Sequence, residues 1–575
     1  MNFGKLDINP ATNPGVLDTG TWDTAIACAS LQRIEHGYWS RLASALEEAR
    51  ILPITDGFHP YPGSVARSDD HTYLLGGLQD GQQILLTISA GQDSIPGAPL
   101  MQIPISNGKI AAFYPTDAQV LHRFWRSICP QKGPQALGCI PRLGIGTRMT
   151  TAVWPGIFQA IRRKGFAANT IQNSVRELHL LDTLLQGMPA ETNYACGFGA
   201  IETGYTGSSY EGLLAAGALE ALKADLRFDY GADADHIQVK RGVDGIARAR
   251  KLLDAAQYYT FFTMDMSDVL NYAALSDTTH IGAEEYLQQE IPVSRQRRDA
   301  LACHLEPQKI GGRTYRLDEA SIGRFVGKHW AALEALETLS AHISTLKVEE
   351  PFDLELSIDE HPSEIQAFDC LTTDEEVLFL ARELRRRGLK VTHIAPNFGI
   401  EKGHDYRAPD GLEGLERRIR SQFAIAEEFG MMLDFHSGDD LSSAPRRVIQ
   451  RATGGRNHFK VSPMLQILYA YTLQEFHPHL FLRWWEDAVA YAQREAQAGS
   501  EFAAECLRAH QQNEDGAPSP RHKVFHHYSF AFVGRRDADG QFLHRHEFYT
   551  LSPEFYQSYQ NSLADYLCML AEELF

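Results

Sequence analysis

The sequence lacks the features that mark several large classes of protein. Its formal net charge is −19, so it has no basic excess with which to neutralise a nucleic-acid backbone. No apolar run is long enough to span a bilayer, and the first residues lack the apolar core of a secretion signal. We therefore expect a cytoplasmic protein that binds neither nucleic acid nor a membrane. A homo-oligomer is compatible with these features.

Paired cysteines are also missing. The eight cysteines are scattered along the chain and none forms a Cys-x-x-Cys pair, so a zinc site built from thiolates is not expected. Scattered, unpaired cysteines are typical of reduced thiols in a cytoplasmic protein.

Motifs for nucleotide binding and for a serine nucleophile are absent as well. Gly144-Ile145-Gly146 and Gly197-Phe198-Gly199 each lack the third glycine of a dinucleotide fingerprint. The sequence contains neither a Walker loop nor a Gly-x-Ser-x-Gly elbow. We therefore expect no NAD cofactor.

The composition is that of a globular protein with several parts. The chain has 575 residues, of which 44% are hydrophobic and 22% charged, and this length allows more than one domain. Residues 1–135 predict a small α+β domain, with a helical pattern near 22–50 followed by three strands separated by Gly-rich turns. This domain contains no catalytic cluster, so we expect it to serve packing or oligomerisation.

Residues 136–510 alternate short apolar strands with amphipathic helices and predict a (β/α)₈ TIM-like barrel, an α/β fold. The eight expected strands lie at 143–148, 167–174, 235–240, 259–265, 352–359, 391–397, 431–436 and 458–462. A mainly helical insertion is expected at 268–350. Residues 511–575 are expected to form a C-terminal cap that begins with a linker, followed by a strand over 523–530.

Several of these strands end in polar residues that share one face. Asp434 and His436 alternate with Leu433 and Phe435, and a buried carboxylate and imidazole are unfavourable unless they have partners. Each residue alone is more often structural, but the pattern recurs in His236, Gln238, Lys240, Thr263, Asp265, Glu355, Ser357, Asp359, His393, Asn397, His458 and Lys460. In this fold the carboxyl ends of the strands form the active site. Imidazoles and carboxylates without thiolates indicate an open site for zinc, manganese, nickel or ferrous iron.

Six short segments carry a resemblance to a known family. They are Tyr61–Ser64, Ser174–Glu177, Ala232–His236, Glu355–Glu360, Asp434–Gly438 and His458–Lys460. In this order and spacing they resemble the tagaturonate/fructuronate epimerases of bacterial hexuronate catabolism, over most of the chain. The resemblance implies an isomerase of carbohydrate metabolism, a metal-dependent epimerase that acts on a small sugar acid.

The two sugar acids differ at a hydroxyl-bearing carbon that is β to the ketone, so the carbonyl does not activate direct proton removal there. Two routes remain, namely transient oxidation by a nicotinamide, or retro-aldol cleavage followed by rotation and re-addition. The missing dinucleotide fingerprint disfavours the first route. A divalent metal ion that polarises the ketone favours the second, together with groups that take and return a proton.

This reaction leads to a set of predicted site residues. The predicted metal ligands are His236, Glu355, His393 and His436. The predicted proton-transfer groups are Lys240, Asp265, Asp359 and Asp434. The residues predicted to hold the carboxylate and hydroxyls are Arg148, Gln172, Lys460 and His526. The alternatives are a metal-dependent aldolase or aldose-ketose isomerase on the same barrel, and a non-catalytic sugar-acid-binding protein.

Overall fold

A computed structural model describes the chain except for residues 1, 11, 69, 92–94, 96, 150–151, 196–198, 277–279, 362–364, 366 and 512–516. The Gly197-Phe198-Gly199 stretch therefore lies largely outside the described residues. So do parts of the predicted insertion and of the predicted linker before the cap.

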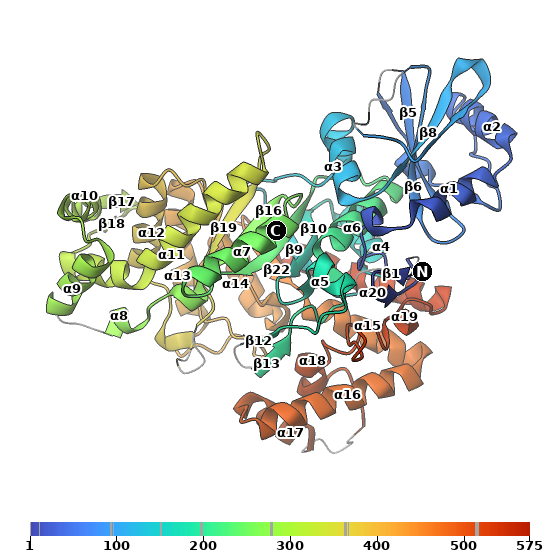
Figure 1. Cartoon of the computed structure of the whole chain (residues 1–575). Helices are drawn as coiled ribbons and strands as arrows, with labels where there is room; N and C mark the ends of the chain where they lie inside the picture. The colour runs from blue at the N-terminus through green and yellow to red at the C-terminus, as the bar shows by residue number, and fades with distance from the viewer. Residues whose placement is uncertain are drawn as a thin grey trace.

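Eight parallel strands form a closed barrel at the centre of the molecule (Figure 1). They are β9 (Arg142–Gly146), β10 (Ala167–Ser174), β15 (Tyr230–Gln238), β16 (Phe261–Asp265), β19 (Asp353–Ser357), β20 (His393–Ala395), β21 (Met432–Phe435) and β22 (His458–Val461). Their order around the barrel follows the chain, and β22 pairs with β9 to close it. The predicted (β/α)₈ barrel is confirmed.

Helices surround the barrel because each strand has one apolar face. On β19, for example, Leu354 and Leu356 belong to the main hydrophobic core, while Glu355 between them faces the barrel interior. The surrounding helices are α4 (Val153–Lys164), α6 (Tyr210–Lys223), α7 (Val243–Ala255), α11 (Glu319–Leu346), α12 (Asp374–Arg386), α13 (Gly411–Glu428), α14 (Ser443–Thr453) and α15 (Pro463–Phe476). Among the described residues, no helix combines the length and apolarity needed to cross a bilayer.

The last helix, α20 (Pro553–Leu574), completes this outer layer. It packs against α4, α14 and α15 and buries a face that includes Phe555, Tyr559, Leu563 and Leu567. Only part of the predicted cap therefore covers the barrel mouth, since its final helix closes the ring between the first and the last helices. The predicted domain limits at residues 135 and 510 stay predictions.

Two further helices and two short ones precede α20. They are α16 (Pro478–Gln497), α17 (Glu501–Gln511), α18 (Lys523–Tyr528) and α19 (Arg545–Phe548). The strand predicted over 523–530 is wrong, because α18 is helical. Its aromatic and β-branched residues favour a strand locally, but burial of Val524, Phe525 and Tyr528 on one side, against α16 and α17, decides in favour of a helix.

The predicted insertion at 268–350 is helical as expected, but it is not all additional to the barrel. Its long helix α11 packs against α7 and α12 and so occupies the outer layer between β16 and β19. The additional part consists of α9 (His280–Glu290), α10 (Ser294–Leu305) and the hairpin of β17 (Gln308–Ile310) with β18 (Arg313–Tyr315). Figure 1 shows these elements on the side of the barrel away from the N-terminal domain.

The N-terminal domain is an antiparallel sheet with helices on both faces. The sheet contains β3 (Phe58–Pro60), β4 (Ala66–Ser68), β5 (His71–Leu78), β6 (Gln83–Ser89), β7 (Met101–Pro104) and β8 (Ile110–Pro115). Alternation along β5 puts Leu74 in one hydrophobic cluster and Tyr73 and Leu75 in the other. The first cluster lies under α1 (Thr24–Gln32) and α2 (His36–Glu47), and the second under α3 (Ala118–Ser127), which packs against α6 of the barrel.

An ion pair closes the amino-terminal end of the barrel. Asp353, at the start of β19, accepts hydrogen bonds from the backbone N–H groups of Leu137 at 2.9 Å and Gly138 at 3.0 Å. It also accepts one from the Arg142 guanidinium at 3.2 Å. Arg142 is fully buried. This floor leaves the carboxyl ends of the strands as the open end of the barrel, where sites of this fold form.

Candidate active site

The barrel interior is polar from its floor to its mouth. Above Arg142 lie the imidazoles of His393 and His458, whose ring centroids are 5.6 Å apart. Burial, with the nearby cations, holds the pKa of both rings well below the usual range, so both are neutral. His458 Nδ1 lies 2.8 Å from Asp434 Oδ2, and this contact orients the ring.

Lys460 occupies the middle of the barrel. Its ammonium donates to Glu355 Oε2 at 2.6 Å and to Asp235 Oδ1 at 2.9 Å, and it lies 3.3 Å from Asp233 Oδ2. It also donates to the Thr263 hydroxyl at 2.7 Å. Although burial disfavours the charged amine, these carboxylates hold the pKa of Lys460 well above its usual range. One buried cation therefore fastens β15, β16 and β19 to β22.

A single ammonium cannot neutralise all the carboxylates around it. Burial raises the pKa of Asp434 well above its usual range, and the nearby Glu355 raises it further. Burial, opposed by Lys460, raises the pKa of Asp233 to about 7. Burial acts in the same direction on Asp235, but Lys460 overcomes it and lowers that pKa to about 2. The cluster thus holds neutral acids beside carboxylates, which is the division needed for proton transfer.

Gly144 makes room for this layer. A Cβ at this position would lie 2.5 Å from Gln172 Oε1 and 2.8 Å from both His458 Nε2 and Lys460 Cγ. The sequence Gly144-Ile145-Gly146 is therefore needed for space inside the barrel. No part of a dinucleotide site is required to explain it.

The predicted inner face of β15 is wrong, because this strand is irregular. Regular alternation would put His236, Gln238 and Lys240 on the inner face, but the pairing of β15 with β16 shifts between Ala234 and Ile237, as in a β-bulge. His236 itself has a φ of 50°. As a result Asp233 and Asp235 face the interior, and His236 still reaches the mouth of the barrel.

Lys240 consequently lies away from the site. Its ammonium pairs with Asp268 near the surface, and it does not line the pocket. The irregular backbone of β15 gives no signal in the sequence beyond the acidic run Asp233–Asp235.

Among the described residues, four groups of side chains converge closely enough to hold a metal ion, and two of them contain His236 or His436. One consists of Glu355, Asp434 and His436, and the other of His236, Asp265 and Glu360. His436 Nε2 and Glu355 Oε1 lie 2.7 Å apart, yet neither forms a hydrogen bond of acceptable geometry, and Asp434 Oδ1 is also buried without one. Unsatisfied buried polar atoms are rare, and these three atoms fit the donor set of a divalent metal.

The four predicted metal ligands are therefore divided between groups. Glu355 and His436 belong to one group and His236 to its neighbour, with the rings of His236 and His436 4.7 Å apart. His393 lies deeper, in a third group with Asp434 and His458. The structure does not bring His393 together with the other three.

The pocket at the barrel mouth has a volume of about 150 Å³. The predicted site residues that line it are Arg148, Gln172, His236, Asp359, His436, Lys460 and His526. Asp359 lies beside His436, with 3.1 Å between Oδ2 and Nδ1. Burial opposes protonation of His436, but Asp359 and Glu355 raise its pKa to about 10. Asp265 and Asp434 lie below the pocket and support His236 and His458.

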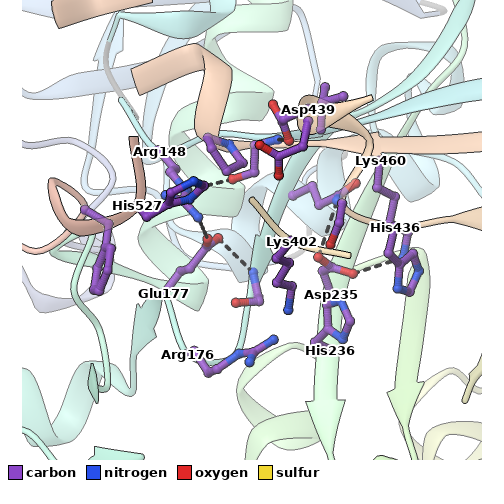
Figure 2. Close-up of a pocket in the computed structure, with 18 of the residues that line it drawn as sticks. Arg148, Arg176, Glu177, Asp235, His236, Lys402, His436, Asp439, Lys460 and His527 are labelled. Carbon is purple, nitrogen blue, oxygen red and sulfur yellow. Dashed lines mark hydrogen bonds and ion pairs between the residues drawn. The ribbon is translucent and has the colours of Figure 1, made fainter. Parts of the chain in front are cut away.

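Two cations in the pocket were not predicted from the sequence. Arg176 follows β10 and Lys402 follows β20, and both bind Glu360, at 3.0 Å and 2.7 Å. Figure 2 shows Lys402 close to Asp235 and His236, with Arg176 beside them. Strand alternation cannot locate loop residues. The only signal was the segment Ser174–Glu177 at the end of a barrel strand, which is also one of the segments that carry the family resemblance.

A third cation, Arg148, was predicted and is held in a fixed orientation. Its Nε donates to the Ser462 hydroxyl at 2.8 Å, and its guanidinium lies 3.2 Å from Glu177 Oε1. The Tyr205 hydroxyl donates to the same Glu177 oxygen at 2.9 Å, and the guanidinium lies over the Tyr205 ring. These contacts restrict the rotamers of Arg148 and aim it into the pocket.

Helix α18 reaches the pocket from above. Both His526 and His527 line it, and His526 Nε2 lies 3.3 Å from Asp440 Oδ1, in the loop after β21. This contact ties the C-terminal segment to the barrel at the edge of the pocket.

Carboxylates, imidazoles and cations surround the mouth of this closed (β/α)₈ barrel. This arrangement is typical of an enzyme that acts on a small polar substrate. A family model described as tagaturonate epimerase matches residues 199–570. The tagaturonate/fructuronate epimerase of Thermotoga maritima is 25% identical over 429 residues, which cover 74% of this chain and 78% of that protein. The chain belongs to the tagaturonate epimerase family, and it is an isomerase that acts on carbohydrates.

Solved structures support the fold. The native structure of fructuronate-tagaturonate epimerase UxaE from Cohnella laeviribosi aligns with a TM-score of 0.63 at 21% identity, covering 93% of this chain and 99% of that one. Its complex with one glycerol aligns with a TM-score of 0.64 at 21% identity, covering 92% and 98%. The likeness extends over the N-terminal domain and the barrel.

We predict that α18 loosens in mild acid. Burial, with His526 beside it, lowers the pKa of His527 from 6.5 to about 3. The stability that this neutral ring contributes is complete above pH 6.5 and is lost as the pH falls below it, by about 2 kcal/mol at pH 5. Asp440 does not offset this loss, since its pKa is lowered and it stays ionised in this range. Hydrogen exchange of α18, corrected for intrinsic rates, should be faster at pH 5 than at pH 8.

His527→Gln removes the titrating ring, and its α18 should exchange equally at both pH values. His546→Gln changes an exposed histidine of the same tail and should keep the pH dependence. Equal protection of wild-type α18 at pH 5 and pH 8 would contradict the prediction.

Proposed function

We propose that this protein interconverts tagaturonate and fructuronate by retro-aldol cleavage and re-addition. The family and the names of its relatives support the substrate pair. The observation that carries the mechanism is that His436, a member of the Glu355–Asp434–His436 group, lines the same pocket as the cations from the loops. The Glu355–Asp434–His436 group would hold a metal ion that polarises the ketone of the substrate, and the loop cations would bind its carboxylate.

In this proposal Glu355, Asp434 and His436 hold a divalent metal ion, with His236 next to them. Their unpaired buried atoms support this assignment. When bound, the ion would act as a Lewis acid toward the ketone. Zinc, manganese, nickel and iron all accept such nitrogen and oxygen ligands.

The chain's own carboxylates would move the proton. Asp235 and Asp359 line the pocket. Burial favours the neutral acids, but Lys460 for Asp235 and His436 for Asp359 lower their pKa values, so both are ionised bases. One takes the hydroxyl proton at the carbon β to the ketone. The bond between that carbon and its neighbour then breaks and leaves an aldehyde and an enediolate. After the aldehyde rotates, the bond re-forms and the proton returns to the new alkoxide.

The cations at the mouth would hold the substrate carboxylate throughout. Lys402, Arg176 and Arg148 all line the pocket. His526 and His527 cover the pocket, which would keep the two fragments together and exclude water. Lys460 would hold the buried carboxylates in place without leaving the barrel interior.

The reaction itself can be followed by NMR. Purified protein with a divalent metal should convert fructuronate into tagaturonate to an equilibrium mixture. Deuterium on the carbon β to the ketone should cause no primary isotope effect, because retro-aldol cleavage leaves that C–H bond intact. A primary isotope effect, or stoichiometric nicotinamide in the protein, would instead support transient oxidation. Accumulation of three-carbon products would indicate an aldolase.

We predict that chelation abolishes turnover and that a divalent transition metal restores it. His436→Ala should weaken metal binding at least about tenfold, because even the loss of an outer partner of a ligand has effects of that size. The measurement is metal content by elemental analysis after equilibration at known free metal. His342→Ala, at an ion pair on α11 far from the pocket, should bind metal normally. Full turnover by metal-free protein would refute the assignment.

Two lysines provide a matched test of substrate binding. Lys402→Met removes a cation of the pocket and should raise KM about tenfold or more, since hydrogen bonds to charged groups contribute about 1.5–3 kcal/mol. Lys240→Met removes a predicted catalytic lysine that lies outside the pocket and should leave both kcat and KM near their wild-type values. Loss of kcat in Lys240→Met would show that Lys240 takes part in catalysis, and would contradict its placement outside the site.

A further inference from the structure

A second cavity, of about 480 Å³, lies on the other side of Tyr205. Tyr205 lines both this cavity and the pocket at the barrel mouth. The remaining walls come from the end of β11 (Leu178–His179), from residues 190–192 and 202–204, from α16, and from the segment after α18 that contains Arg535 and Arg536. The cavity has no part in the proposed epimerisation.

Three of its lining residues carry buried polar atoms that lack a hydrogen-bond partner. They are His179 Nε2, Thr203 Oγ1 and Arg536 Nη1. Buried polar atoms are normally paired, so three on the wall of one cavity indicate a polar occupant. The space is within the range of small-molecule sites, about 300–1,000 Å³.

The charges around the cavity specify the occupant further. Within the described part of the chain, neither Arg494 nor Arg536 forms an ion pair, whereas Arg535 pairs with Asp487. Glu202 and Glu495 also line the cavity, but neither neutralises these two guanidinium groups at contact distance. An anion would supply the missing partner of Arg536, because a guanidinium binds carboxylate and phosphate oxygens well.

His179 adds a requirement for a hydroxyl group. Burial, with Arg536 and Arg545 nearby, lowers its pKa to about 3, so the ring is neutral. Its Nε2 is buried without a partner, and each nitrogen of a neutral imidazole either donates or accepts a hydrogen bond, depending on the tautomer. Thr203 can donate or accept. A ligand that satisfies all three atoms therefore has both an anionic group and a hydroxyl.

We propose that this cavity is a second binding site for a small polyhydroxylated anion, either a sugar acid or a sugar phosphate. Residues 203–206 connect this cavity to the active site by hydrogen bonds. The backbone N–H of Gly204 donates to Arg176 O at 2.8 Å, and the Tyr205 hydroxyl donates to Glu177 at 2.9 Å. A ligand that binds against Thr203 and Tyr205 therefore lies next to residues that hydrogen-bond Arg176 and Glu177, and Glu177 holds Arg148 in its orientation.

The test is calorimetric titration of the metal-loaded protein with D-gluconate, glucose 6-phosphate and inorganic phosphate. At least one sugar should bind at a site that Lys402→Met leaves intact. Arg536→Ala and Thr203→Val should weaken that binding about tenfold or more, the effect expected for a lost charge-assisted contact. Both variants should keep wild-type turnover when the added anion is absent. Arg227→Ala, at an exposed arginine, is the matched control and should bind as wild type does.

The two sugar probes distinguish the source of the anion, since each carries only one of the two anionic groups. Binding that disappears in Lys402→Met would assign the anion to the active pocket and overturn the proposal. So would equal affinity of Arg536→Ala and wild type, the absence of binding by both sugars, or inorganic phosphate binding as tightly as either sugar. These outcomes do not depend on turnover, so failure of the proposed epimerisation is distinguishable from failure of this site.

Discussion

The site depends on one buried cation. Lys460 reaches Glu355, Asp233 and Asp235 from the opposite side of the barrel, and without it these carboxylates would repel one another in a medium of low dielectric. Barrels of this fold usually fill their interior with branched aliphatic residues. Here the interior is a hydrogen-bonded ionic network. The contacts that pack the barrel interior therefore also set the protonation states of its acids.

The rest of the barrel accommodates this network. Gly144 leaves the space into which Lys460, Gln172 and His458 project, and the Arg142–Asp353 pair seals the end opposite the pocket. Because Lys460 is already bound by several carboxylates, it is poorly placed to recognise an anionic substrate. In the proposed function that task falls to cations on the loops, where Arg176 and Lys402 share the single carboxylate of Glu360.

Elements outside the barrel act on the same pocket. Helix α18 brings two histidines to its edge, and α20 holds the same C-terminal segment against α4. Tyr205 separates the pocket from the second cavity and bonds the residue that orients Arg148. The barrel mouth is therefore bounded on two sides by segments that can respond to conditions outside the reaction, namely pH at His527 and anions at Arg536.

The sequence by itself determined the barrel, because eight strands with one apolar face alternate with amphipathic helices, and it determined that the inner faces are polar. It also predicted that the side chains of Lys460, Glu355 and His436 face the barrel interior, and they do, although their roles stay predictions. Only the tertiary structure decided the rest. A bulge in β15 turned Asp233 and Asp235 inward, loops brought Arg176 and Lys402 to the pocket, and depth in the barrel separated His393 from the mouth. Alternation along a strand specifies a face, but neither the register between strands nor the path of a loop.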